Sequence, residues 1–183
     1  MGLRHMLRGL QTGAGDLSRE HMRNLTVRLT CDNQIEVQLG TESRTGECYY
    51  LDLRTETESG VESAVGLIAG VRLLLAGWLT LLTELADGDQ VFLPFDFSDE
   101  YTQWMTVHRS GRDASVVFGW ANIEGWAISI RDPSSYSAAA AQFQPDEPLH
   151  VQTFYLPRLI GDLRHAVGRF LENGTERTAD TAS

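Results

Sequence analysis

The feature that most constrains this fold is a nearly continuous apolar run over residues 61–86, which lies between stretches of alternating apolar and polar residues. Within the run, apolar side chains recur at helical spacing, as at Leu67, Val71, Leu74 and Trp78, and this period predicts one long helix. The alternating stretches predict strands that form sheets with one apolar face, and that face must be buried against another element. The helix can cover it. The sequence therefore predicts an α+β fold in which antiparallel β meanders pack against one long central helix and a C-terminal helix.

A membrane span is the alternative interpretation of this run. Its length is sufficient, and Gly66 and Gly70 have the spacing that lets membrane helices approach closely. Arg72 lies near the centre of the run, where a charge in lipid costs at least about 2.5 kcal/mol. We therefore favour a buried helix that ends at the Asp-Gly-Asp sequence of residues 87–89.

The residues before the helix predict three strands in a meander. Residues 25–29 and 35–39 alternate between apolar and polar, with Asp32 and Asn33 between them, which is typical of a hairpin. A connection rich in Gly and Thr is expected to lead into a third strand over residues 48–57.

The residues after the helix predict a second meander, then a strand and a helix. The expected strands cover residues 91–95, 101–108, 116–120, 126–130 and 149–154. Pro94 has no backbone N–H to donate to a neighbouring strand, so the first of these strands is expected at an edge or a bulge. Residues 132–144 are rich in Ser and Ala and predict irregular structure, with a short helix over residues 138–141. The last strand leads into a helix over residues 156–172, with Pro157 in its first turn.

Length and charge limit the domain organisation and the partners. A chain of 183 residues that is 42% hydrophobic is long enough for one core. We expect a single domain over residues 23–172, a disordered or mis-started segment over residues 1–22, and a disordered tail over residues 173–183. The net charge of -10 argues against nucleic acid or an anionic membrane as a partner, because phosphate groups require clustered cations. A basic protein is the partner that this charge favours.

The compartment is expected to be cytoplasmic. The first residues lack the apolar core of a secretory signal. Cys31 and Cys48 fall in neighbouring predicted strands, so a disulfide between them is conceivable. A reducing compartment favours two free thiols instead.

Acidic and aromatic residues gather between residues 90 and 131. Tryptophan is enriched in interface hot spots, although each of these tryptophans could instead pack in the core. The carboxylates match no metal-binding loop, and we predict neither a metal site nor a cofactor. We predict a partner-binding face made of Asp96, Asp99, Glu100, Trp104, Trp120, Glu124 and Trp126.

No combination of residue types predicts catalysis. Ser98 has no Gly-x-Ser-x-Gly context, neither cysteine has a catalytic signature, and the helix glycines form no phosphate loop. The histidines are scattered along the chain. We therefore predict a protein that is not an enzyme and has no catalytic residues.

The order of predicted elements resembles that of the small bacterial WapI-like immunity proteins. The likeness is carried by residues 79–86, before the second meander, and by the sequence Phe-Tyr-Leu-Pro-Arg-Leu at residues 154–159, which enters the last helix. It covers most of residues 24–172. Such proteins are small, acidic and free of catalytic residues, and they work by occluding a cognate toxin. The resemblance implies a toxin-binding protein, but it assigns no binding residue to this chain.

Three functions remain open at this point. The first is a non-catalytic protein-binding module, such as an immunity protein, that neutralises a basic toxin through the acidic and aromatic face. The second is a small-molecule-binding protein or enzyme with a pocket between the long helix and the sheet, and with Asp99, Glu100 or His108 at its mouth. The third is a structural subunit whose apolar helix packs against a second copy or a membrane partner.

Overall fold

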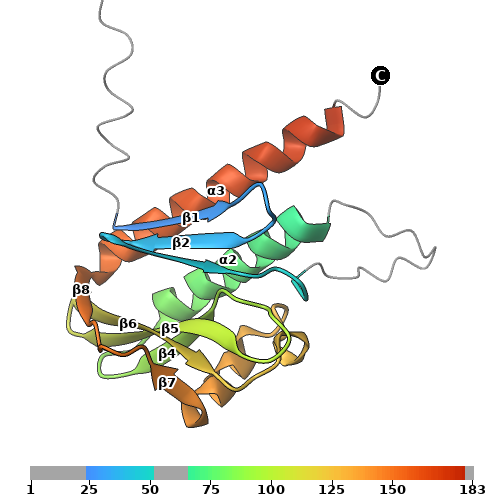
Figure 1. Cartoon of the computed structure of the whole chain (residues 1–183). Helices are drawn as coiled ribbons and strands as arrows, with labels where there is room; N and C mark the ends of the chain where they lie inside the picture. The colour runs from blue at the N-terminus through green and yellow to red at the C-terminus, as the bar shows by residue number, and fades with distance from the viewer. Residues whose placement is uncertain (1–23, 52–65, 180–183) are drawn as a thin grey trace, which may run out of the picture.

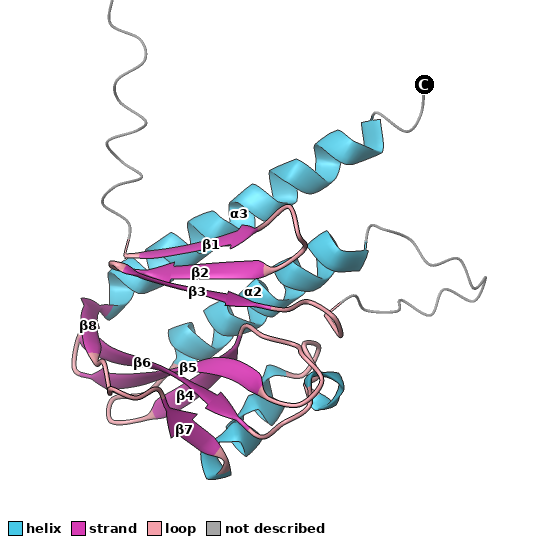
Figure 2. Ribbon diagram, in the orientation of Figure 1, coloured by secondary structure: helices cyan, strands magenta, loops and turns pink. Residues whose placement is uncertain are grey.

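The computed structural model describes residues 24–51 and 66–179. These residues form two antiparallel sheets and two α-helices, which confirms the predicted α+β class (Figures 1 and 2). The helices are α2, Gly66–Glu84, and α3, Leu156–Ala179. In the view of Figure 1, α2 passes behind both sheets and α3 runs along the smaller sheet.

The smaller sheet contains β1 (Leu25–Leu29), β2 (Ile35–Leu39) and β3 (Glu42–Gly46) in that order. The predicted hairpin of β1 and β2 is confirmed, with Val27 opposite Val37. Asn33 in the turn has a φ of 59°, a conformation that Asn tolerates better than most residues. The apolar residues of both strands are mostly buried and form one wall of the core.

The third strand differs from the prediction. It is β3, and it occupies the connection rich in Gly and Thr, whereas residues 48–51 form a turn and residues 52–57 lie outside the described residues. Gly40 has a φ of 57° and closes a tight turn, so the chain pairs with β2 immediately. Since β3 is mostly polar, its pairing follows from turn geometry rather than from hydrophobic alternation.

The larger sheet is built around a long hairpin. Its strands are β4 (Gln90–Pro94), β5 (Thr102–Ser110), β6 (Asp113–Ala121), β7 (Phe143–Pro145) and β8 (Gln152–Tyr155). β4 lies at one edge, as Pro94 predicted, while β7 and β8 both pair with the far side of β6. The pairing of β7 was missed by the sequence analysis.

The prediction of a strand over residues 126–130 is wrong. Those residues contain part of the short 3₁₀ helix η1 (Gly125–Ala127) and a turn. The backbone N–H of Gly125 donates to the carbonyl oxygen of Ser98 at 2.8 Å, and this contact pulls the chain away from the sheet. The segment that follows forms a second 3₁₀ helix, η2 (Pro133–Ala141), which places Tyr136 in the core.

The helix α2 is the centre of the core. Its residues Val71, Leu74, Leu75 and Trp78 are fully buried. Among the described residues, α2 alone is long and apolar enough to cross a membrane, and 44% of its apolar window is buried inside the protein. A core helix of this kind meets the same criterion.

The helix α3 packs against α2 and also contacts β1 of the smaller sheet. It runs to Ala179, beyond the end expected at residue 172. The carboxylate of Asp162 accepts hydrogen bonds from the backbone N–H groups of Asn24, at 2.9 Å, and Leu25, at 3.3 Å. These bonds hold the start of β1 against α3. The domain boundaries at residues 23 and 173 stay predictions.

The substitution Gly46→Ala should destabilise the fold. A Cβ atom at this position would lie 2.2 Å from the carbonyl oxygen of Phe95 and 2.7 Å from the Cα of Asp96, so backbone would have to move. We expect a loss of about 1–3 kcal/mol in the free energy of unfolding, measured by denaturant titration.

Gly161→Ala is the matched control, because a Cβ there meets nothing within 4 Å in α3. This change should instead stabilise the protein by about 0.5–1 kcal/mol, the usual gain from Gly to Ala in a helix. Equal effects at the two glycines would contradict the close backbone approach at Gly46.

Candidate acidic and aromatic interaction site

Three loops meet at one end of the two sheets. They are the turn after β3, the loop between β4 and β5, and the loop after β6. The N–H of Tyr50 donates to the carbonyl oxygen of Phe97 at 3.2 Å, and the N–H of Gly125 donates to that of Ser98 at 2.8 Å. The loop between β4 and β5 is therefore hydrogen-bonded to a neighbour on each side.

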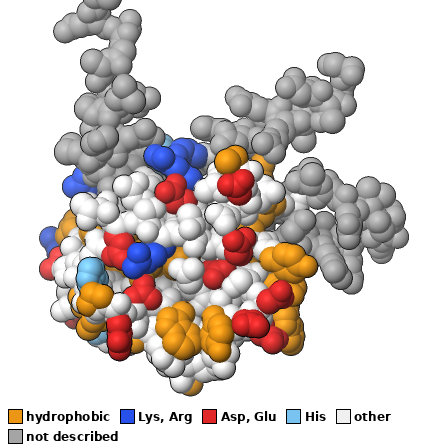
Figure 3. All heavy atoms as spheres, in the orientation of Figure 1, with side chains coloured by type: hydrophobic (Ala, Val, Ile, Leu, Met, Phe, Trp, Pro, Cys, Tyr) orange, Lys and Arg blue, Asp and Glu red, His pale blue; other side chains and the backbone are white. Residues whose placement is uncertain are grey.

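These loops and the end of β6 carry a cluster that we name the acidic–aromatic rim. It consists of Tyr49, Tyr50, Asp99, Glu100, Tyr101, Trp120, Glu124 and Trp126. Tyr49, Tyr101 and Trp126 are 73%, 52% and 65% exposed, which is unusual for large rings. On the face that Figure 3 shows, acidic and hydrophobic side chains lie side by side near the lower right edge.

Ring contacts order part of the rim. The rings of Tyr101 and Trp120 meet edge to face with centroids 5.4 Å apart, and those of Tyr49 and Tyr50 do so at 4.9 Å. Such pairs contribute about 0.5–1.5 kcal/mol beyond the burial of area. Rings that are already ordered lose less conformational entropy when a partner binds.

A hydrogen bond fixes one rim carboxylate. The hydroxyl of Tyr50 donates to the Oδ1 of Asp99. This bond is the main reason that the pKa of Tyr50 rises to about 12, and the negative charges of Asp99 and Glu124 add to the effect. The rim therefore presents an oriented carboxylate beside exposed rings.

Asp96 was predicted to face a partner, but it is buried, with 4% of its surface exposed. Its Oδ1 accepts from the backbone N–H of Glu47 at 2.9 Å and its Oδ2 accepts from the hydroxyl of Ser98 at 3.2 Å. Burial raises the pKa of the Asp96 carboxyl, and these hydrogen bonds partly oppose the rise. Asp96 therefore lies beneath the rim rather than on its surface.

Trp104 was also predicted to face a partner and is only 1% exposed. Its Nε1 donates to the hydroxyl of Thr102 at 2.7 Å, and its ring packs edge to face on Tyr136, with centroids 6.0 Å apart. Alternation along β5 predicted one face in water, but η2 covers this end of that face. The alternating pattern could not show this cover.

The other five predicted residues lie at the rim. They are Asp99, Glu100, Trp120, Glu124 and Trp126, and their role in binding stays a prediction. The sequence analysis missed the three tyrosines, because Tyr49 and Tyr50 were assigned to a strand. The adjacent pair of tyrosines beside an acidic segment is the signal that could have identified them.

The residues named for the pocket of the second hypothesis lie far apart. Asp99 and Glu100 precede β5 and His108 lies near its far end, so the rise along the strand separates them by about 20 Å. A pocket with one of them at its mouth stays a prediction. A hollow of about 460 Å³ lies between the two helices, where Ala69, Leu73 and Val167 line it.

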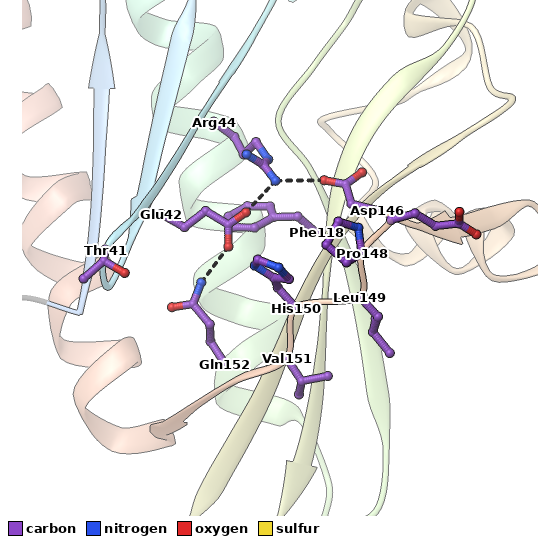
Figure 4. A pocket seen from close by; sticks show the side chains of 11 residues that line it. Thr41, Glu42, Arg44, Phe118, Asp146, Pro148, Leu149, His150, Val151 and Gln152 are labelled. Atoms are coloured by element: carbon purple, nitrogen blue, oxygen red, sulfur yellow. Dashed lines mark hydrogen bonds and ion pairs between the residues drawn. The ribbon is translucent and has the colours of Figure 1, made fainter.

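A larger hollow, of about 710 Å³, lies between the two sheets (Figure 4). The guanidinium of Arg44 bridges the carboxylates of Glu42 at 2.5 Å and Asp146 at 3.1 Å. It also lies 5.6 Å from the centre of the Phe118 ring. Arg44 thus ties β3 of the smaller sheet to the chain that follows β7.

Among the described residues, neither metal-binding side chains nor cysteines form a further candidate site. No group of three or more His, Cys, Asp or Glu side chains is placed to hold a metal ion among the residues that the structure describes. Cys31 is exposed and Cys48 is buried, and both are free thiols.

Comparison with known proteins adds little to this geometry. No family model and no curated protein matches the chain. Among solved structures, a chain of the CdiA-CT/CdiI toxin and immunity complex from Enterobacter cloacae is similar, with a TM-score of 0.45 and 10% sequence identity over 74% of this chain and 86% of that chain. So low a score says nothing of what this chain binds. The resemblance to WapI-like immunity proteins stays a prediction.

The substitution Asp99→Asn should lower the pKa of Tyr50 from about 12 toward its ordinary value of 10.0. The neutral amide no longer penalises the tyrosinate that forms at high pH. The ultraviolet absorbance of tyrosinate measures this, and Tyr50→Phe identifies the Tyr50 component. Glu100→Gln is the control and should leave that component in place. An unchanged titration in Asp99→Asn would contradict the hydrogen bond.

Asp96 should make the stability of the protein depend on pH. Because its pKa is raised in the fold, the folded state holds this proton to a higher pH than the unfolded state does. The free energy of unfolding should therefore fall as pH rises from the ordinary pKa of 3.8 through the raised value.

Comparison of variants isolates this contribution. Asp96→Asn keeps an acceptor for the N–H of Glu47 and removes the titration, so its profile should be flatter than that of the native protein. Asp96→Ala leaves a backbone N–H without its acceptor and should cost about 1–3 kcal/mol more than Asp96→Asn. Thermal unfolding across this pH range tests both. Parallel profiles of the native protein and the Asp96→Asn variant would refute the assignment.

Proposed function

We propose that this chain is a non-catalytic, cytoplasmic protein-binding module that docks a basic protein on the acidic–aromatic rim. The observation that carries the proposal is the association of three exposed carboxylates with rings that are exposed yet ordered.

The chemistry of the rim suits a cationic partner. Asp99, Glu100 and Glu124 give the rim three negative charges, and the whole chain has a formal net charge of -10. Such a field speeds encounter with a positive surface and disfavours acidic competitors. Arginine side chains of a partner can pair with the carboxylates and stack on the rings at the same time.

The finer part of the proposal is that the partner is a toxin, which this chain would neutralise as an immunity protein. Support comes from the acidic composition and from the resemblance of the predicted element order to that of WapI-like immunity proteins. An inhibitor of this kind acts by occlusion, so it needs a complementary surface but no reactive group.

Affinity capture from the source lysate tests the proposal. The native protein should retain a basic protein, and a triple charge reversal, Asp99→Arg with Glu100→Arg and Glu124→Arg, should lose it. Once that protein is identified, Trp126→Ala should weaken binding by about 2 kcal/mol, or roughly thirty-fold, as expected of a hot-spot aromatic. Calorimetric titration measures this loss, and added salt should weaken binding further.

A matched control reverses three exposed acids elsewhere, with Asp32→Arg, Glu84→Arg and Asp89→Arg. This variant has the same net charge as the rim variant and should retain the partner. If the two variants behave alike, overall charge rather than the rim governs binding. Capture of an acidic protein through the rim would also contradict the proposal.

A further inference from the structure

Strand β8 has one unpaired edge. It pairs with β6 on one side, and within the part of the chain that the structure describes no strand pairs with its other side. Figure 1 shows β8 at the left margin of the molecule. An edge of this kind presents backbone N–H and C=O groups that can extend the sheet into another chain.

β8 and the three residues before it display an apolar row. Leu149, Val151 and Tyr155 are 59%, 54% and 46% exposed. They alternate with His150 and Gln152, whose side chains point toward Glu42 in Figure 4 while Leu149 and Val151 point away. Exposed apolar residues beside an unpaired edge are avoided in most monomers.

The row is nearly symmetric about Gln152. If two copies of this segment pair in antiparallel fashion with Gln152 at the centre, Leu149 of one lies opposite Tyr155 of the other. Val151 then lies opposite Thr153. The first pairing joins an aliphatic to an aromatic side chain, and the second joins two β-branched side chains. Cross-strand pairs of these kinds stabilise antiparallel strands.

The charges at the ends of the segment are also complementary. Glu147 precedes the row and is exposed, and α3 begins immediately after the row with no acidic residue in its first turn. The antiparallel arrangement brings Glu147 of one copy near the helix N-terminus of the other. Carboxylates are favoured there, because the N-terminus carries a partial positive charge.

We infer that two copies of this chain associate through β8, in an antiparallel pairing centred on Gln152 that joins their larger sheets. A two-fold axis through the centre makes every contact twice. The row is short, and so small an interface is expected to give a weak dimer that dissociates at micromolar concentration. The rim lies near the opposite end of β6 and stays accessible, so this inference does not depend on the proposed function.

The register is tested by charge pairs at Val151 and Thr153. The native protein should change from its monomer mass of 20.4 kDa to twice that mass as concentration rises in sedimentation equilibrium. Val151→Lys with Thr153→Lys places like charges opposite each other and should give a monomer throughout. Val151→Lys with Thr153→Glu places opposite charges there and should restore the dimer.

Trp126→Lys on the rim is the control and should leave the dimer intact. Circular dichroism checks that each variant is folded. A native protein that stays monomeric at every concentration overturns the inference, as does a dimer that survives the two lysines. A dimer that the lysine and glutamate pair fails to restore overturns the register. None of these results bears on whether the rim binds a basic protein.

Discussion

The buried carboxylate of Asp96 is the interaction on which the rim depends. It accepts hydrogen bonds from the N–H of Glu47, at the end of the smaller sheet, and from Ser98 in the loop between β4 and β5. A buried carboxylate is unfavourable unless it is hydrogen-bonded, and here the bonds join parts of the chain that are distant in sequence. Asp96 therefore aligns the two sheets at the end where the loops meet.

Small residues make that alignment possible. Gly46 lies against the backbone of Phe95, and Gly125 lies against the backbone of Phe97. Because neither glycine has a Cβ, the three loops come within hydrogen-bonding distance. Phe95 and Phe97 are buried beneath them, while Tyr49 and Trp126 stay exposed. The rim thus results from close backbone packing beneath it as well as from the residues that it exposes.

Regular patterns predicted most of the fold. The hairpin of β1 and β2, the long helix α2 and the pairing of β5 with β6 all follow from alternation or helical spacing. β3 and η1 were missed because a glycine turn and a glycine contact decide them, and neither has a hydrophobic period. At the site, sequence placed Trp120 and Trp126 correctly in an acidic region, but it could not show that η2 covers Trp104.

The hydrogen bond between Tyr50 and Asp99 has a consequence for the thermodynamics of docking. With a pKa of about 12, the Tyr50 hydroxyl keeps its proton at every physiological pH. A cation that approaches Asp99 meets a carboxylate that already accepts a hydrogen bond from Tyr50, and Tyr50 releases no proton when the cation binds. The heat of association that arises at this pair would therefore be the same in buffers of different ionisation enthalpy.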